Sequence, residues 1–275
     1  MNLSIAIPNS SLIDETNKVD KTRKISKIAR ACAIFNVKEI YIYRDSAGNK
    51  TDSILLSTLL KYLETPQYFR KQMFPKMNVL KFAGVLQPLK LPHHLTTSNP
   101  KLIKIGDIRD GLVLNYKGKK YVDMGINRLV PYFGKKESGI RIIIQITKIL
   151  PKISIKEISR EQIKEYWGYK VSEGMKIHSL LSSWNDTIIL TTKHGKIFTK
   201  SDAEEYKKLE KPILVVFGSP KKGIHEILGD IKKIQNCASI NFFPNQATET
   251  VRLDEAILGT LSILNIFSIN YTYFN

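Results

Sequence analysis

The apolar and polar positions of residues 1–64 predict strands and helices in turn. Leu3 to Pro8 and Glu39 to Tyr43 are short apolar runs of β type, whereas Lys21 to Asn36 and Thr51 to Glu64 repeat apolar residues at helical spacing. This order predicts a parallel sheet covered by helices. The side chains expected to face inward are Ile25, Ile28, Ala29, Cys32 and Ala33 in the first helix and Ile54, Leu55, Leu59, Leu60 and Leu63 in the second.

Between residues 85 and 163 the pattern changes to short β-prone segments, which favour a small β-barrel. The segments are Ile103–Ile105, Gly111–Tyr116, Lys120–Met124 and Arg141–Ile149. Tyr116 to Tyr121 predicts a hairpin turn, and Glu161 to Trp167 predicts a short helix that leads back to the first domain. We therefore expect residues 1–84 and 164–275 to form one α/β domain, with residues 85–163 inserted as a barrel.

Three further apolar runs each end abruptly in a loop. They are Thr187–Thr192 before Lys193–Gly195, Ile213–Phe217 before Gly218–Gly223, and Ile240–Phe243 before Pro244–Arg252. In α/β proteins such strand ends meet at the carboxyl edge of the sheet, where ligands bind. We expect a ligand site at this edge, with helices at Ile224–Leu228 and Asp254–Ile266. The glycine loop is neither a Walker A motif nor a Rossmann fingerprint, since neither spacing is present.

The net charge makes a polyanion the expected partner. Lysine and arginine number 43 against 25 acidic residues, which gives +18 at pH 7 and a pI near 9.7. Codon bias or a thermophilic lifestyle could also enrich lysine, but glutamate does not rise with it, so nucleic acid is favoured. The residues expected to contact RNA phosphates are Arg23, Lys24 and Lys27 in the first helix and Lys117, Lys119 and Lys120 in the barrel. A solvated basic face, and tyrosines that only fill the barrel wall, are the alternatives.

Other classes of site find little support in the sequence. The two cysteines, Cys32 and Cys237, lie far apart, and Cys32 is expected to be a buried free thiol. The five histidines follow no zinc pattern, so no metal is predicted. No apolar run is long enough for a membrane span and no signal layout begins the chain, so we expect a cytoplasmic protein with no membrane partner.

Two stretches of the last quarter resemble the signature of the SPOUT methyltransferases. They are Phe217–Ile224 and Asn241–Leu258, and Lys21–Val37 resembles the first helix of the RNA methyltransferase subfamily that archaea and eukaryotes share. The resemblance implies a deep trefoil knot around a mostly parallel sheet, an OB-like insertion, S-adenosylmethionine as cofactor and a homodimer that acts on structured RNA such as rRNA. Ala247 departs from the pattern, because relatives often carry glycine there.

The resemblance and the residue chemistry together indicate which side chains form the site. Those expected at the cofactor are Thr192, His194, Gly195, Gly218, Asn241, Phe243, Gln246 and Leu258. Glycine lets the backbone approach a ligand, and the two amides could satisfy ribose hydroxyls or the methionine end. His194 could equally be an exposed turn residue.

The acceptor must lose a proton if it is a ring N–H or a hydroxyl. Glu249 is the candidate base, with Arg252 or Arg30 holding RNA phosphate or stabilising negative charge. Glu249 could instead be an ordinary cap of the final helix. The rival functions are an RNA-binding ribosome-assembly factor that has lost turnover and, ranked last, a DNA-binding regulator, for which no helix-turn-helix or zinc pattern is found.

Overall fold

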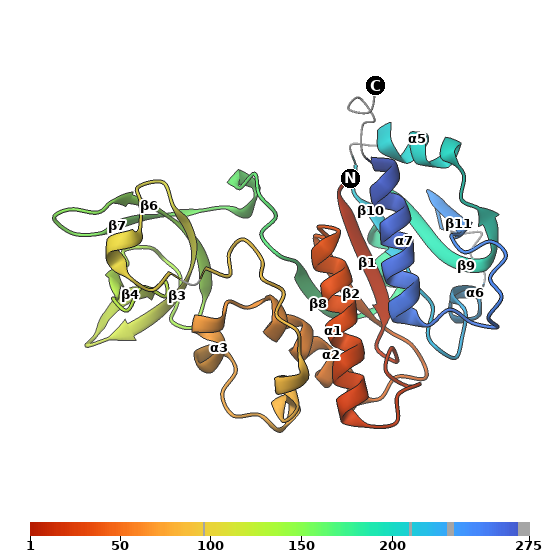
Figure 1. Ribbon diagram of the computed structural model, residues 1–275, viewed down its shortest axis with the longest axis horizontal. Coiled ribbons are helices and arrows are strands. Elements are labelled where there is room, and N and C mark those ends of the chain that lie inside the picture. The colour runs from red at the N-terminus through yellow and green to blue at the C-terminus, as the bar shows by residue number, and fades with distance from the viewer. Residues whose placement is uncertain (96, 209–210, 230–233, 269–275) are drawn as a thin grey trace. The chain divides into compact units, whose positions relative to one another are not determined.

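The computed structural model describes residues 1–268 except 96, 209–210 and 230–233 (Figure 1). These residues form two compact units. One unit contains residues 1–63, 78–89 and the described residues from Tyr169 onward, and the other contains residues 64–77 and 90–168. None of the described helices is long and apolar enough to span a membrane.

A six-stranded sheet forms the centre of the first unit, with strand order β11-β9-β10-β1-β2-β8. Its strands are β1 (Leu3–Pro8), β2 (Glu39–Arg44), β8 (Lys170–Lys176), β9 (Thr187–Ile197), β10 (Ile213–Val216) and β11 (Cys237–Asn241). Every neighbouring pair is parallel, so the carboxyl ends of all six strands lie along one edge. The predicted parallel α/β sheet is confirmed.

Helices cover this sheet on its two faces. They are α1 (Lys18–Ile34), α2 (Lys50–Glu64), α4 (Ile177–Ser183), α5 (Lys200–Lys208), α6 (Ile224–Leu228) and α7 (Leu253–Ser268). The first helix begins at Asn17, whose side chain accepts a hydrogen bond of 2.9 Å from the Asp20 N–H, as an N-cap does. It ends before Asn36, which has φ 55°. Contacts join α1 to α7, and Figure 1 shows the two side by side on one face.

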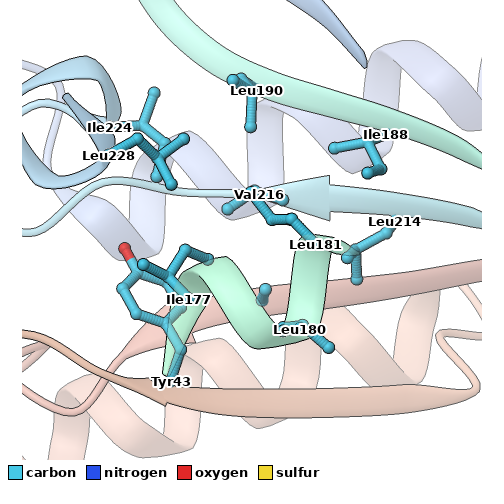
Figure 2. Close-up of a cluster of buried hydrophobic side chains, with 11 residues drawn as sticks. Tyr43, Ile177, Leu180, Leu181, Ile188, Leu190, Leu214, Val216, Ile224 and Leu228 are labelled. Atoms are coloured by element: carbon cyan, nitrogen blue, oxygen red, sulfur yellow. The ribbon is translucent and has the colours of Figure 1, made fainter. Parts of the chain in front are cut away.

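The short helices α4 and α6 pack on the opposite face of the sheet (Figure 2). Leu180 and Leu181 of α4 and Leu228 of α6 are buried against alternate residues of β9 and β10, such as Leu190 and Val216. Burying an aliphatic side chain contributes about 1.5–3 kcal/mol, so this layer is a main source of stability for the strands that lead to the site.

The second unit is built on a five-stranded antiparallel sheet, with strand order β5-β4-β3-β6-β7. The strands are β3 (Ile108–Tyr116), β4 (Lys119–Asp123), β5 (Val130–Pro131), β6 (Arg141–Lys148) and β7 (Ser154–Ile158). At the two outer ends of this order, the Tyr132 hydroxyl donates a 2.8 Å hydrogen bond to Glu157, which brings the edges together as in a barrel. The predicted hairpin turn is confirmed at Lys117 and Gly118, both with positive φ. The helix α3 (Gln67–Met73) also belongs to this unit.

A buried polar network joins separate segments of the second unit. Arg141 donates to Glu64 at 2.6 Å and to Asp110 at 2.6 Å. His93, which is fully buried, lies 3.2 Å from the Glu64 carboxylate, and the Trp167 indole donates to Asp110 at 3.2 Å. Charged groups this deeply buried need such partners, because an unpaired buried charge is costly.

Four local predictions are wrong. The segment Glu161 to Trp167 is not a helix, since helical geometry there is confined to the 3-10 turn Arg160–Gln162. Ile103 to Ile105 is not a strand. Ile54 is 45 % exposed, because the buried stripe of α2 runs through Leu55, Leu56, Leu59, Leu60 and Leu63. The strand from Thr187 does not end at Thr192, because β9 continues to Ile197 around a bulge.

Candidate functional site: a pocket at the carboxyl ends of β9, β10 and β11

A cavity of about 470 Å³ lies in the first unit, where β9, β10 and β11 reach the carboxyl edge. Its walls come from residues 191–194, 217–224 and 240–243, from Gln246 and residues 249–253, from Glu226 of α6, and from Ala256 and Thr260 of α7. Asp14, from the connection between β1 and α1, completes it. The predicted meeting of three strand ends therefore occurs, and a concave site of this size suits a small molecule.

The first wall is a bulge in β9. Ser239 and Ile240 are adjacent in β11, but their partners in β9 are Leu190 and Lys196, so residues 191–195 leave the ladder. The Thr191 hydroxyl donates 3.0 Å to the Val216 carbonyl oxygen, which fixes the base of the bulge to β10. The bulge thus presents Thr192, Lys193 and His194 to the pocket.

Gly195 lies where the β9–β11 ladder resumes, and it does not line the pocket. A Cβ atom at this position would lie 2.6 Å from the Ser239 carbonyl, so only glycine lets the two strands come this close. Gly195 was predicted to let the backbone approach a ligand, but in the structure it lets β9 approach the backbone of β11.

The second wall is the glycine loop after β10. A Cβ atom on Gly218 would lie 2.9 Å from the Ile224 amide nitrogen, so glycine is needed for the loop to fold back on itself. Ser219 fixes the apex: its hydroxyl accepts from the Lys222 N–H at 2.9 Å, and its N–H donates to the Lys222 carbonyl at 2.8 Å. Before the loop, the Tyr43 hydroxyl donates 2.7 Å to the Phe217 carbonyl, and burial raises the pKa of Tyr43, so this donor keeps its proton.

The third wall is shaped by two amides. Asn241 Nδ2 donates 3.0 Å to the Lys193 carbonyl, and its Oδ1 accepts 2.8 Å from the Phe243 N–H. Gln246 Nε2 donates to the carbonyls of Thr248 and Glu249 at 2.9 and 3.2 Å. Both side chains line the pocket, but these hydrogen bonds hold its loops in place and do not point to a ligand.

Helix α7 supplies an unsatisfied polar atom to the pocket. The Thr260 hydroxyl is fully buried and has no hydrogen-bond partner among the described residues. A buried hydroxyl without a partner costs about 1–3 kcal/mol, so a ligand group that bonded to it would recover that energy. The Phe243 ring packs against α7 at Gly259, where a Cβ atom would lie 2.5 Å from the ring.

An ion pair with a buried lysine holds Asp14, the pocket carboxylate that comes from the connection between β1 and α1. Lys24 Nζ lies 2.6 Å from both carboxylate oxygens of Asp14, and the Lys24 side chain is 2 % exposed. The prediction that Lys24 lies on a basic outer face is therefore wrong. The sequence did contain the signal, because Lys24 precedes Ile28 by four residues and so shares the face of the apolar stripe.

The remaining cations of α1 that were expected to contact RNA also have acidic neighbours. Arg23 pairs with Asp20 at 2.9 Å, and Lys27 pairs with Asp254 at 3.1 Å. In the barrel unit, Lys120 lies 3.1 Å from Glu137, whereas Lys117 stands over the Tyr116 ring at 5.5 Å. Lys119 begins β4 and is exposed.

The pocket gathers most of the residues predicted for the site, but not all. It is lined by Thr192, His194, Gly218, Asn241, Phe243, Gln246, Glu249 and Arg252. Leu258 is 47 % exposed on α7 and does not line it. Nor does Arg30, which donates 3.2 Å to the Pro88 carbonyl. Asp14 and Thr260 were missed, because only tertiary packing brings them to the cavity, whereas Lys193 was missed although it lies between the predicted residues Thr192 and His194.

Comparison with known proteins identifies the family. A family model described as "Putative RNA methyltransferase" matches residues 2–264. The 28S rRNA (uridine-N(3))-methyltransferase of Homo sapiens is 27 % identical over 95 % of this chain and 77 % of its own length. The enzyme of that name from Drosophila melanogaster is 26 % identical over 95 % of this chain and 61 % of its own length. An uncharacterised protein of Halobacterium salinarum is 26 % identical over 97 % and 99 %. The chain therefore belongs to this RNA methyltransferase family, whose model matches nearly its whole length.

Proposed function

We propose that the protein transfers a methyl group from S-adenosylmethionine to N3 of a uridine in large-subunit ribosomal RNA. The observation that carries the proposal is the pocket, which the glycine loop, the β9 bulge and the loop after β11 form in a chain of this family. The base and the atom are those named for the relatives from Homo sapiens and Drosophila melanogaster.

The residues present fit this donor. S-adenosylmethionine combines an adenosine, a sulfonium and an amino-acid end, and a cavity of about 470 Å³ lies within the range of sites for such ligands. Phe217, Phe242 and Phe243 offer apolar surface to the adenine, and the Thr260 hydroxyl offers a free buried partner. Thr192, His194 and Gly218 would contact the donor through side-chain or backbone groups. When bound, the donor supplies a methyl group already activated by the positive sulfur.

The protein would then align the acceptor nitrogen and accept the proton that this nitrogen loses. Of the three carboxylates that line the pocket, Glu226 already accepts a 3.1 Å bond from the Gly223 N–H. Glu249 is exposed in the loop before α7, and Asp14 is fixed by Lys24. We propose that Glu249 accepts the N3 proton as the new N–C bond forms, and that Asp14 orients the uracil ring. Arg252, which lines the pocket, would stabilise the charge that develops on the ring.

We further propose that the segment after β11 threads the loops after β9 and β10 as the trefoil knot of the SPOUT fold. The sheet order supports this, since β9 lies between β11 and β10 and the connections after all three strands line one cavity.

The barrel unit is proposed to bind RNA. A five-stranded, partly open antiparallel barrel is the OB architecture, which binds single strands through aromatic side chains and cations. Phe133 is 95 % exposed and Tyr116 is 51 % exposed, so both can stack on bases. This division, with the donor in the first unit and RNA on the barrel, stays a prediction.

A homodimer is also proposed. Of the apolar residues in α7, Ile257, Leu261 and Leu264 are buried within the protomer, whereas Leu258 and Ile266 are 47 % and 51 % exposed. A partner subunit would cover these two. Leu258→Glu should then convert a dimer to a monomer in light scattering, and a wild-type protein that is monomeric at micromolar concentration would refute this part.

The proposal is tested by modification mapping in cells. Deleting the gene should remove 3-methyluridine from one position of large-subunit RNA, detected by nuclease digestion and mass spectrometry, and the wild-type gene should restore it. Unchanged methylation, together with slow ribosome assembly in the deletion strain, would instead favour the assembly-factor function.

A further inference from the structure

The mouth of the pocket carries exposed cations that have no acidic partner. Lys193, Lys221, Lys222 and Arg252 line the cavity, are exposed and form no ion pair with any described residue. On α1 the situation is the opposite, since each lysine from Lys21 to Lys27 pairs with a carboxylate. The rim of the pocket therefore offers an external anion four exposed cations that no described carboxylate neutralises.

The backbone of these cations is held in place by the loops themselves. Ser219 Oγ accepts from the N–H groups of Lys221 and Lys222 at 3.3 and 2.9 Å, so the two lysines follow each other at a fixed apex. Lys193 is held through its carbonyl, to which Asn241 donates at 3.0 Å. A rigid backbone lowers the entropy cost of binding, because only the side chains must be ordered.

We propose that Lys193, Lys221 and Lys222 bind the phosphates on either side of the target nucleotide. This inference rests on the proposed function, because it places the RNA backbone across the opening through which the methyl group is transferred. A ring buried in the pocket must leave its own phosphates outside, at the rim where the cations lie. Lysine suits this role, since it acts as a point charge and selects no base.

The experiment compares two double variants that lose the same charge. Lys221→Gln with Lys222→Gln removes two rim cations. Lys170→Gln with Lys208→Gln removes two exposed lysines, at the amino end of β8 and in the last turn of α5, which form no ion pair with a described residue and do not line the pocket. Binding of a fluorescein-labelled single-stranded RNA of mixed sequence is measured by anisotropy across a range of salt concentrations, and binding of S-adenosylmethionine is measured by calorimetry.

The rim variant should bind RNA more weakly, with a salt slope that is shallower by about 1.4, because each lost phosphate contact removes about 0.7 on a single strand. The control variant should keep the wild-type slope. An RNA with uncharged methylphosphonate linkages should bind the rim variant and the wild type alike. Lys193→Gln alone should reduce the slope by about half as much as the double variant.

Affinity for S-adenosylmethionine should not change in the rim variant. If that affinity falls while RNA binding is kept, the lysines hold the methionine carboxylate and the inference is overturned. Equal slopes for the rim and control variants would also overturn it, since the effect would then be one of net charge. A wild-type protein that binds RNA through the rim but never binds the methyl donor would refute the proposed function and leave the phosphate site standing. Thermal melts of both variants confirm that the fold is intact.

Discussion

Asn241 donates a 3.0 Å hydrogen bond to the carbonyl oxygen of Lys193, a residue 48 positions earlier in the chain. The same amide accepts from the Phe243 N–H at 2.8 Å. One side chain therefore links the bulge of β9 to the loop after β11, and these are two of the three walls of the pocket. Asn241 acts on a ligand through the loops that it positions.

Replacing Asn241 with alanine should loosen both walls. Two hydrogen bonds of about 1 kcal/mol each are lost, so the affinity for S-adenosylmethionine should fall about tenfold or more. Calorimetry measures this directly, with Asn115→Ala on the exposed end of β3 as the control. RNA affinity should not change. Unaltered donor binding in Asn241→Ala would show that the two loops keep their shape without the amide.

Lys24 and Lys27 lie on the same helix and both pair with an aspartate, but only the partner of Lys24 lines the pocket. Lys24→Met should destabilise the protein by about 2 kcal/mol, because it leaves Asp14 without its buried partner, and should also lower kcat. Lys27→Met should cost less than about 1 kcal/mol, since the Lys27 side chain is 69 % exposed, and should leave kcat unchanged.

Denaturant unfolding and single-turnover methyl transfer separate these effects. The double variant Asp14→Asn, Lys24→Met should regain stability without regaining activity, because no unpaired charge remains but the carboxylate is gone. Full activity in the double variant would remove Asp14 from the mechanism.

The sequence patterns correctly predicted the sheet, its main helices and the edge where the pocket lies, because strand ends and apolar stripes are local features. They could not show that residues 191–195 leave β9 as a bulge, since Thr191 and Thr192 suit a strand and the break depends on how β11 pairs. Asp14 lies in a polar connection that looks ordinary until α1 packs beside it. Leu258, which the resemblance placed at the cofactor, does not line the pocket, and its side chain lies on the exposed side of α7.

The barrel unit should lose stability in acid. Burial next to His93 lowers the pKa of His94 from 6.5 to about 4. Burial alone would raise the pKa of Glu64, but Arg141 and His93 outweigh it, so that pKa lies below its ordinary value. Both folded-state values are depressed. The stability contributed by His94 is therefore complete above pH 6.5 and is lost as the pH falls toward 4, where Glu64 adds to the loss.

The expected loss from His94 is about 3 kcal/mol. Trp167 reports on this unit in a Trp184→Phe variant, because these are the two tryptophans of the chain. Urea unfolding followed by Trp167 fluorescence at pH 7 and pH 4.5 measures the change. His94→Gln should flatten the profile, and an identical profile in that variant would show that His94 is not the titrating group.

Phe133 tests the division of labour between the units. Its ring is 95 % exposed, so Phe133→Ser should preserve folding while removing about 1–3 kcal/mol of base stacking. Affinity for single-stranded RNA should fall, and affinity for S-adenosylmethionine should stay the same. The control is Ile105→Ser, because Ile105 is also an exposed apolar residue of this unit. Val130→Ala would not serve, because Val130 is buried. Donor binding that fell with Phe133→Ser would show that this ring serves the donor site as well as RNA.

The central claim is that the pocket binds S-adenosylmethionine and directs its methyl group to a uridine of ribosomal RNA. Its most direct measurement is transfer of tritium from methyl-labelled S-adenosylmethionine to large-subunit RNA taken from a strain that lacks the gene. We predict stoichiometric labelling that digests to 3-methyluridine, and its loss in Gly218→Val, whose side chain would collide with the Ile224 amide. RNA that is bound tightly but stays unlabelled, with no heat of binding for the donor, would contradict the account.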